Sequence, residues 1–356
     1  MKFNLSSICN YRNEKVNVET LNNRTYISTE NMLPNKRGVV KATSLPDILQ
    51  TQKFKKGDVL VSNIRPYFKK IWKAEFDGGC SNDVLVFYAN DNIDANFLYY
   101  ILSNDSFFNY SMTTSKGTKM PRGDKNSIMK YMVPDFGIET QRKIASILCS
   151  IDEKIRLNNK INNNLEQQTQ AIYSRMFIEH RQESWSTGQL SDLISVKYGK
   201  DHKKLADGNY PVYGSGGIIR YVEKPLHTGE SVLIPRKGTL NNVIYVNEAF
   251  WSVDTMFYTE MLHPNIAKFV YHFVKSKDLA SLNAGSAVPS MTTNILNAMQ
   301  LYIPDEKTLE KFENIVSPMY SAMQENTKES KILANTRDTL LPKLMSGELD
   351  VSDIDL

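Results

Sequence analysis

The sequence has few residues of the kinds that hold metal ions or form disulfide bonds. Its three cysteines, Cys9, Cys80 and Cys149, are odd in number and widely spaced, and its five histidines are equally scattered. No CxxC or mixed Cys/His spacing gathers these residues into a metal site. This usage predicts unpaired thiols in a reducing cytoplasm, and no metal ion bound by the chain.

Long hydrophobic runs and a large charge of one sign are also lacking. No stretch approaches the roughly eighteen consecutive apolar residues of a membrane span, and the first residues lack the apolar core of a secretory signal. Basic residues only slightly outnumber acidic ones, 43 against 39, which is compatible with nucleic-acid binding without indicating it. With 41% hydrophobic and 23% charged residues over 356 positions, the composition predicts a soluble chain of about two or three globular domains.

The motifs of several enzyme classes are missing. No Pro-Pro dipeptide occurs, so the Asn/Asp-Pro-Pro-aromatic tetrapeptide of amino-methyltransferases is absent, and no GxxxxGK[ST] loop is present to bind ATP. A loose PD…(D/E)xK nuclease pattern does occur twice, at Pro134-Asp135 with residues 152–154 and at Pro304-Asp305 with residues 329–331. Its last members fall in helical patterns, not on the adjacent strand positions that such a site needs, so a nuclease is a less favoured alternative.

The sequence contains the same order of short motifs twice. Ser81 and Asp83 precede the apolar run 84–88, and Ser252 and Asp254 precede the run 255–258 about 170 positions later. The same order continues in the segments 97–102 and 269–274, the motifs 117–121 and 285–289, and the dipeptides Val133-Pro134 and Ile303-Pro304. A repeat of this length indicates two copies of a domain followed by a helix, and its approximate two-fold symmetry suits a two-fold partner such as duplex DNA.

Each copy ends in a long helical pattern with a heptad seam that turns polar near its middle. If the two helices run antiparallel, Asn158 is expected to pair with Asn326 and so to fix their register. The alternative is an Asn/Gln-rich stretch on a solvated helix face. The predicted seam residues are Ile151, Ile155, Asn158, Asn162, Leu165 and Ile172 in the first helix, and Met319, Met323, Asn326, Leu333 and Leu340 in the second.

Basic and polar residues cluster in the predicted loops of both copies. Arginine and lysine suit guanine edges or phosphates and asparagine suits adenine, although any single lysine is more often a solvated surface charge. The glycine-rich run 213–217 could cradle a phosphate, but a simple turn is its commoner role. The candidate DNA-binding residues are Asn63, Arg65, Tyr67, Lys69, Lys116, Thr118, Lys119 and Arg122 in the first copy, and Lys200, Lys203, Ser215, Arg236, Lys237, Thr239, Asn241, Ser286 and Ser290 in the second.

Several of these segments resemble a known family. The run Glu-Thr-Gln-Arg-Lys-Ile-Ala-Ser-Ile-Leu at 139–148, followed by Ile-Asp-Glu-Lys-Ile at 151–155, is similar to the helical region after a target-recognition domain in specificity subunits of type I restriction–modification systems. The run 340–349 resembles the close of their second helical region, and the motifs 57–60, 117–121 and 213–217 are also similar. The resemblance covers essentially the whole chain, but the first copy has no evident counterpart of the 213–217 loop.

The resemblance implies an α/β (α+β) fold with two target-recognition domains in tandem, 1–138 and 181–305. Two long antiparallel coiled-coil helices, 139–180 and 306–348, would separate these domains with pseudo-two-fold symmetry, and 349–356 would form a tail. The resemblance implies a non-catalytic cytoplasmic subunit that reads a split, asymmetric site on double-stranded DNA. Its helices would set the spacing between the two half-sites and dock two modification (methyltransferase) subunits, which restriction subunits join.

The cofactors S-adenosylmethionine, ATP and Mg are expected on the partner subunits, and none on this chain. The competing class is a protein-interaction scaffold that does not read DNA. Because base contacts depend on loop geometry, the sequence alone does not identify the recognised bases.

Overall fold

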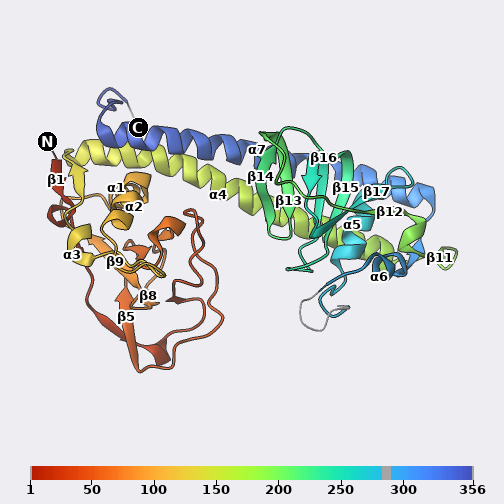
Figure 1. Ribbon diagram of the computed structural model, residues 1–356, viewed down its shortest axis with the longest axis horizontal. Helices are drawn as coiled ribbons and strands as arrows, with labels where there is room; N and C mark the ends of the chain where they lie inside the picture. The colour runs from red at the N-terminus through yellow and green to blue at the C-terminus, as the bar shows by residue number, and fades with distance from the viewer. Residues whose placement is uncertain (1, 283–289, 355–356) are drawn as a thin grey trace. The chain divides into compact units, whose positions relative to one another are not determined.

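The computed structural model describes residues 2–282 and 290–354, and the chain divides into two compact units. Unit 1 comprises residues Met1–Asn158 and Thr327–Leu356, and unit 2 comprises Asn159–Asn326. Each unit therefore combines one globular domain with parts of the two long helices, α4 and α7, which Figure 1 labels.

The domain of unit 1 is built on two four-stranded sheets, with strand orders β2-β9-β6-β7 and β3-β5-β8-β4, and a ribbon in which β1 pairs antiparallel with β10. Its strands are β1 (Lys2–Asn4), β2 (Cys9–Tyr11), β3 (Lys15–Asn17), β4 (Tyr26–Ile27), β5 (Gln50–Phe54), β6 (Val59–Ser62), β7 (Ile71–Lys73), β8 (Gly78–Cys80), β9 (Val84–Ala89) and β10 (Met132–Pro134). Its helices are α1 (Ala95–Ser103), α2 (Asp105–Thr113) and α3 (Lys125–Ile128), with 3-10 turns η1 (Leu5–Ser7), η2 (Val18–Thr20) and η3 (Pro66–Phe68).

The domain of unit 2 is built on one six-stranded sheet of order β12-β17-β15-β16-β13-β14 and a ribbon of β11 with β18. Its strands are β11 (Ser186–Gln189), β12 (Ile194–Tyr198), β13 (Asp207–Gly214), β14 (Gly217–Val222), β15 (His227–Pro235), β16 (Ile244–Ser252), β17 (Met256–Met261) and β18 (Gln300–Ile303). Its short helices are α5 (Ala267–Lys275) and α6 (Thr293–Asn297), with a 3-10 turn η5 (Leu190–Asp192).

The two domains share one chain order around their edges. In each, a ribbon strand leads through a 3-10 turn into a sheet strand (β1-η1-β2 and β11-η5-β12). A buried strand then leads into a nine-residue helix (β9-α1 and β17-α5), and a short helix leads through the second ribbon strand into a long helix (α3-β10-α4 and α6-β18-α7). Helix α2 and the separate second sheet distinguish unit 1. The predicted tandem of mixed α and β domains with long helices is thus confirmed.

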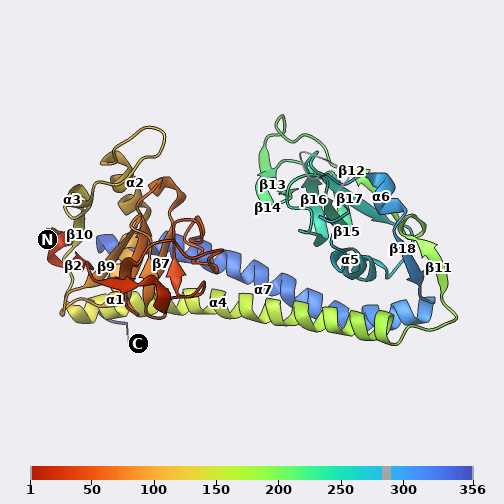
Figure 2. The ribbon, with the colours of Figure 1, turned by 90° about the horizontal axis from the view of Figure 1, so that it is seen from below.

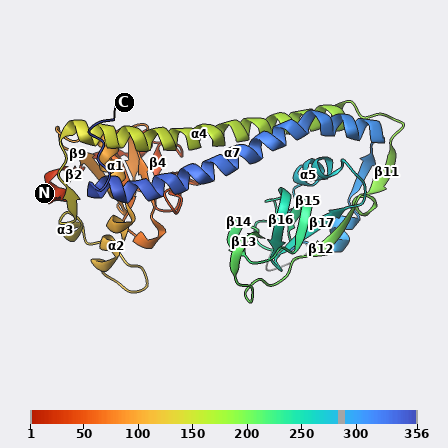
Figure 3. The same ribbon diagram turned by 90° about the horizontal axis from the view of Figure 1, so that it is seen from above.

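The long helices are α4 (Ile138–Ser174), which continues as a π-helical turn η4 (Arg175–Glu179), and α7 (Glu306–Ser346). In the part of the chain that the structure describes, neither these nor any other helix is long and apolar enough to cross a membrane. Every predicted seam residue is buried or partly buried, because the heptad spacing keeps one stripe facing the other helix. Within each unit the two helix segments run antiparallel (Figure 3). Asp152 pairs with Arg337 in unit 1, and Asn162 pairs with Asn326 in unit 2.

The polar middle of the seam forms hydrogen bonds inside each unit. In unit 1, the Asn158 amide donates to Glu329 Oε2 at 2.7 Å and to Ser330 Oγ at 3.3 Å. In unit 2, Asn326 donates to Asn162 Oδ1 at 2.9 Å, and Asn162 donates to the Met323 carbonyl at 3.1 Å. Polar pairs of this kind fix helix register at some cost in stability. The predicted pair of Asn158 with Asn326 joins residues of different units and stays a prediction.

Each domain core extends onto the long helices. In unit 1, Leu148 of α4 and Leu344 of α7 are buried with Phe97 and Leu98 of α1. In unit 2, Phe312 and Val316 of α7 are buried in the core that holds α5. Burying a leucine or phenylalanine side chain stabilises a protein by roughly 1.5–3 kcal/mol, so these contacts fasten each domain to its helix segments.

A polar contact between a domain helix and the long helices accompanies each of these cores. In unit 1, the Tyr100 hydroxyl of α1 donates to Asp152 Oδ2 at 2.8 Å, and Arg337 donates to Asp152 Oδ1 at 2.6 Å. In unit 2, helix α5 lies between the sheet and the long helices (Figure 2). His272 of α5 takes the place of Tyr100, and its ring nitrogens lie 2.9 Å from Gln170 Oε1 and from the Tyr320 hydroxyl. The contact in unit 1 is therefore ionic, and the contact in unit 2 is neutral.

Candidate nucleic-acid interface

The two predicted clusters of unit 1 meet at one edge of the domain. The first cluster lies in the loop after β6, which contains η3, and the second precedes α3. Ile64 forms a β-bridge with Arg122, the Arg65 amide donates to the Pro121 carbonyl at 2.8 Å, and the Gly123 amide donates to the Asn63 carbonyl at 3.2 Å. Backbone hydrogen bonds therefore hold the two loops together as one surface, which we call loop surface 1 (residues 63–70 and 116–122).

Acidic side chains hold several cations of loop surface 1 in place. Lys116 lies 2.8 Å from Asp124, and this ammonium together with the Ser127 amide lowers the pKa of the Asp124 carboxyl to about 2. Arg122 lies 3.1 Å from Asp83, at the start of β9. These pairs are exposed to solvent and contribute little to stability. Their effect is to orient long flexible side chains, and they leave the cations accessible.

A third segment joins this surface and was missed from the sequence. The turn at residues 34–38 lies against η3, because the Asn35 amide donates to the Phe68 carbonyl at 2.8 Å and the Lys36 amide donates to the Lys69 carbonyl at 2.9 Å. Lys36 and Lys69 both reach Asp105, at 2.8 and 2.7 Å. The Pro-Asn-Lys-Arg-Gly run is a recognisable turn signal with two basic residues, but nothing local indicated which loop it would meet.

Two polar atoms of loop surface 1 are buried without a hydrogen-bond partner among the described residues. They are Asn63 Oδ1 and Arg65 Nε. Leaving a buried polar atom unsatisfied costs roughly 1–3 kcal/mol, and such atoms are rare in native proteins. One of these atoms is an acceptor and the other a donor, so this loop holds unpaired polar groups of both kinds.

The same loops meet at the same edge of unit 2. Here the loop after β15 lies against the segment before α6: Lys237 forms a β-bridge with Ser290, and the Met291 amide donates to the Arg236 carbonyl at 2.9 Å. The glycine-rich β13–β14 turn joins them, since the Asn242 side chain donates to the Ser215 carbonyl at 2.7 Å. We call residues 215, 236–242 and 290 loop surface 2.

The remaining predicted residues of unit 2 differ in how free their side chains are. Lys237 and Thr239 are exposed, as are Lys200 and Lys203 after β12, where the Lys200 amide is bonded to the Ser252 carbonyl at 2.8 Å. Asn241 instead ties its own loop to a neighbouring turn, because its amide donates to Asp278 at 3.0 Å and its carbonyl oxygen accepts from the Ala280 amide at 3.0 Å. Ser286 lies outside the described residues.

The Arg236 guanidinium is partly held by its own unit. It lies 5.4 Å from the Tyr198 ring centroid and donates to the Asp254 carbonyl at 3.2 Å. The corresponding Asp83 of unit 1 bonds Arg122 instead. The Ser-x-Asp motif before β9 and β17 thus anchors an arginine of the neighbouring loop in both units.

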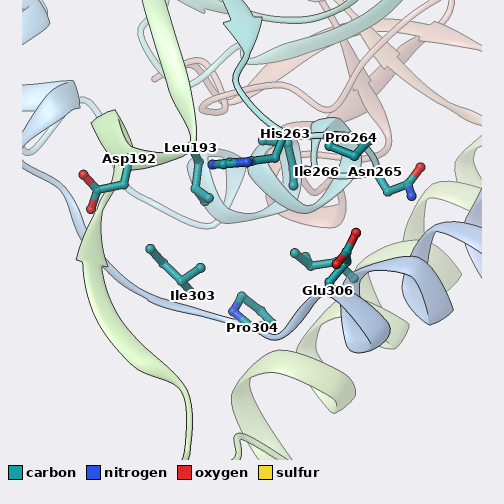
Figure 4. Close-up of a pocket in the computed structure, with 10 residues that line it drawn as sticks. Asp192, Leu193, His263, Pro264, Asn265, Ile266, Ile303, Pro304 and Glu306 are labelled. Atoms are coloured by element: carbon teal, nitrogen blue, oxygen red, sulfur yellow. The ribbon is translucent and has the colours of Figure 1, made fainter.

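A cavity of about 390 Å³ in unit 2 contains none of the predicted residues. Figure 4 shows its lining, which comes from η5, from the segment before α5, and from the connection between β18 and α7. Asp192 at its rim caps η5 by accepting from the Gln189 amide at 2.8 Å. Among the described residues, no group of three histidine, cysteine or acidic side chains could hold a metal ion. The nuclease pattern forms no such group either, since Asp152 bonds Tyr100 and Arg337, and Glu329 bonds Asn158.

The chain is similar to proteins of one known family. The family model described as "Type I restriction modification DNA specificity domain" matches residues 1–167 and 182–334. The chain is 21% identical to the type I restriction enzyme HindI specificity subunit of Haemophilus influenzae, over 98% of this chain and 99% of that protein. It is 20% identical to the MjaIX specificity subunit of Methanocaldococcus jannaschii, over 74% of this chain and 71% of that protein.

A solved structure shares the fold. The type I restriction–modification S subunit of M. genitalium superimposes with a TM-score of 0.59 and 20% identity, covering 99% of this chain and 96% of that one.

Proposed function

Because this chain belongs to the type I restriction–modification DNA specificity family, we propose that it selects the DNA sequence for its complex without being catalytic itself. Loop surface 1 would read one half of a split, asymmetric site on double-stranded DNA, and loop surface 2 the other half. The observation that carries this proposal is the repeated meeting of the same loops at the same domain edge, with different side chains in the two units.

The side chains available suit this task. Arginine and lysine bind guanine edges and phosphates, and asparagine binds adenine. Loop surface 1 offers Arg65, Lys119 and Asn63, whereas loop surface 2 offers Lys237 and Thr239 together with the glycine-rich turn. Because the scaffold repeats while the loops differ, the two half-sites would have unlike sequences.

The long helices would set the spacing between the half-sites and dock two modification subunits, which restriction subunits join. Support for the spacing role comes from the continuous runs of 37 residues in α4 and 41 residues in α7, about 56 and 62 Å long at 1.5 Å per residue. The catalytic cofactors S-adenosylmethionine, ATP and Mg would then bind the partners, as no nucleotide motif is present in this sequence.

Selection from a random-sequence duplex library, with the full chain alone and with its modification subunits, tests the proposal. A gapped motif with two unlike halves should be enriched. Changing Lys116, Lys119 and Arg122 to alanine should degrade one half only, and changing Arg236 and Lys237 should degrade the other. Each lost bidentate base contact costs ~1–3 kcal/mol, whereas lost phosphate contacts weaken all sequences alike.

The matched control is the alanine variant of Lys328, an exposed lysine of α7 outside both loop surfaces. This variant should leave the selected motif unchanged. If no motif is enriched with or without the modification subunits, the proposal fails and the chain is a scaffold. If either loop variant weakens the selection of both half-sites equally, the loops contact the DNA phosphate backbone without reading its sequence.

A further inference from the structure

Loop surface 1 carries an exposed pair of aromatic side chains in η3. Tyr67 is 49% exposed and Phe68 38%, and their ring centroids lie 4.6 Å apart in η3. Apart from Phe3, every other aromatic side chain of this domain is buried or partly buried. An exposed aromatic pair inside a polar, basic surface is typical of a contact site for a partner with flat apolar groups.

The residues that flank this pair adopt an unfavourable backbone conformation. Arg65 and Lys69, which flank η3, are both left-handed, with φ of 50° and 49°. The facing turn contributes two more left-handed residues, Asn35 and Lys36. These are four of the five left-handed non-glycine residues in the described part of the chain. Strained conformations of this kind persist where the surrounding structure enforces them, and they cluster at functional sites.

Three lysines lie near the aromatic pair. The Lys70 ammonium lies 5.8 Å from the Phe68 ring centroid and donates to the Thr29 carbonyl at 2.6 Å. Lys36 and Lys69 meet at Asp105, next to the same turn. A flat apolar pair with lysines nearby is suited to a base step with the phosphates on either side.

We propose that Tyr67 and Phe68 form a wedge that inserts at a base step of the half-site bound by unit 1 and bends or unstacks the DNA there. The lysines around the wedge would hold the flanking phosphates. Proteins that insert apolar side chains between base steps kink the duplex in this way. The inference rests on the proposed function, which it extends from reading bases to deforming the site.

Unit 2 has no such pair in the corresponding loop. Thr239 is exposed there, and the neighbouring Leu240 is buried. The half-site bound by unit 2 is therefore an internal reference for any effect of Tyr67 and Phe68.

The experiment uses the full chain and the duplex that it selects from the random library. Bending is measured by energy transfer between dyes at the duplex ends, and unstacking by the fluorescence of 2-aminopurine placed at each adenine in turn. We expect a bend and a fluorescence rise confined to one half-site. The alanine variant of Tyr67 should lose both and bind roughly 5- to 150-fold more weakly, the range for one lost base–aromatic stack.

Two variants serve as controls. Tyr67→Phe should keep the bend because it keeps the ring, and Leu49→Ala should keep it because Leu49, although 91% exposed, lies outside the surface. Circular dichroism checks that the variants are folded, which is expected since about half of the Tyr67 surface is in solvent.

If the wild-type chain binds its selected duplex without bending or unstacking it, or if Tyr67→Ala preserves both signals, the wedge is refuted while DNA reading stands. If Tyr67→Ala instead lowers only the affinity for the modification subunits, the aromatic pair contacts a protein and the wedge is equally refuted. Failure to enrich any motif would contradict the proposed function itself.

Discussion

His272 should make the stability of unit 2 depend on pH in a range where unit 1 does not respond. The imidazole is fully buried among α4, α5 and α7, stacked on Tyr173 at 5.4 Å between ring centroids. Burial, assisted by the nearby Lys275 ammonium and opposed by Glu166, lowers the pKa of His272 from its usual value to about 4. The folded state therefore resists taking up a proton that the unfolded chain accepts.

The sign and size of the effect follow from this difference. Because the folded pKa lies below the unfolded value of about 6.5, the full stability is present above pH 6.5 and is lost as the pH falls toward 4. The complete loss would be about 3 kcal/mol, and the part between pH 7 and pH 5 about 2 kcal/mol. Glu166 and Glu230 also lie near α5, but Lys275 and Lys268 lower the pKa values of these carboxyls, so both remain ionised between pH 7 and pH 5.

Hydrogen exchange measured by mass spectrometry resolves the two units in the intact chain. After correction for the intrinsic rate, the amides of α5 should lose about 20-fold in protection between pH 7 and pH 5, because 1.36 kcal/mol corresponds to a factor of ten. Helix α1 should change little, since Tyr100 occupies the corresponding position. The variant His272→Gln should abolish the difference. Equal losses in α1 and α5, or an unchanged response in the variant, would refute the reasoning.

Three further outcomes are expected. One heptad can be inserted after Lys160 in α4 and one after Thr327 in α7, between the two polar seam pairs. This change should lengthen the selected spacer by about 3 base pairs, because seven residues add roughly 10 Å. An unchanged spacer in the folded protein would show that the helices do not set the spacing. Arg337→Met should destabilise unit 1 in urea unfolding by about 1–3 kcal/mol, because it leaves the partly buried Asp152 carboxylate without its cationic partner. Adding Asp152→Asn should recover part of this loss. Strictly additive losses in the double variant would contradict this coupling. The purified chain should neither bind S-adenosylmethionine in calorimetry nor methylate or cleave duplex DNA, and methyl transfer by the chain alone would overturn the assignment of catalysis to its partners.

The insertion sites of the heptad experiment depend on the observed contacts. Positions equivalent by duplication lie 168 residues apart, as the starts of α4 and α7 do. Facing positions in an antiparallel pair are different ones: Asp152 faces Arg337, and Asn162 faces Asn326. Only insertions at facing positions keep both halves of the seam in register.

The sequence by itself determined the features that depend on local periodicity and composition. Heptad spacing is a property of one helix, so residues such as Leu165 and Leu333 could be assigned to the buried stripe before any partner was known. The duplicated order of strands and helices was readable for the same reason. Turn and strand signals also showed that Arg65 and Arg236 follow buried strands, which put both residues in loops.

Only the tertiary structure decided which loops meet and which side chains remain available. The Asn35–Phe68 hydrogen bond joins residues far apart in sequence, and no local pattern specifies it. The same holds for Asn242 with Ser215, and for Asn241, whose amide is used within unit 2. Backbone propensity acts over a few residues, whereas the packing of domain edges depends on many distant contacts together. The chain's local patterns therefore specify its two scaffolds, and long-range packing assembles their loops into surfaces.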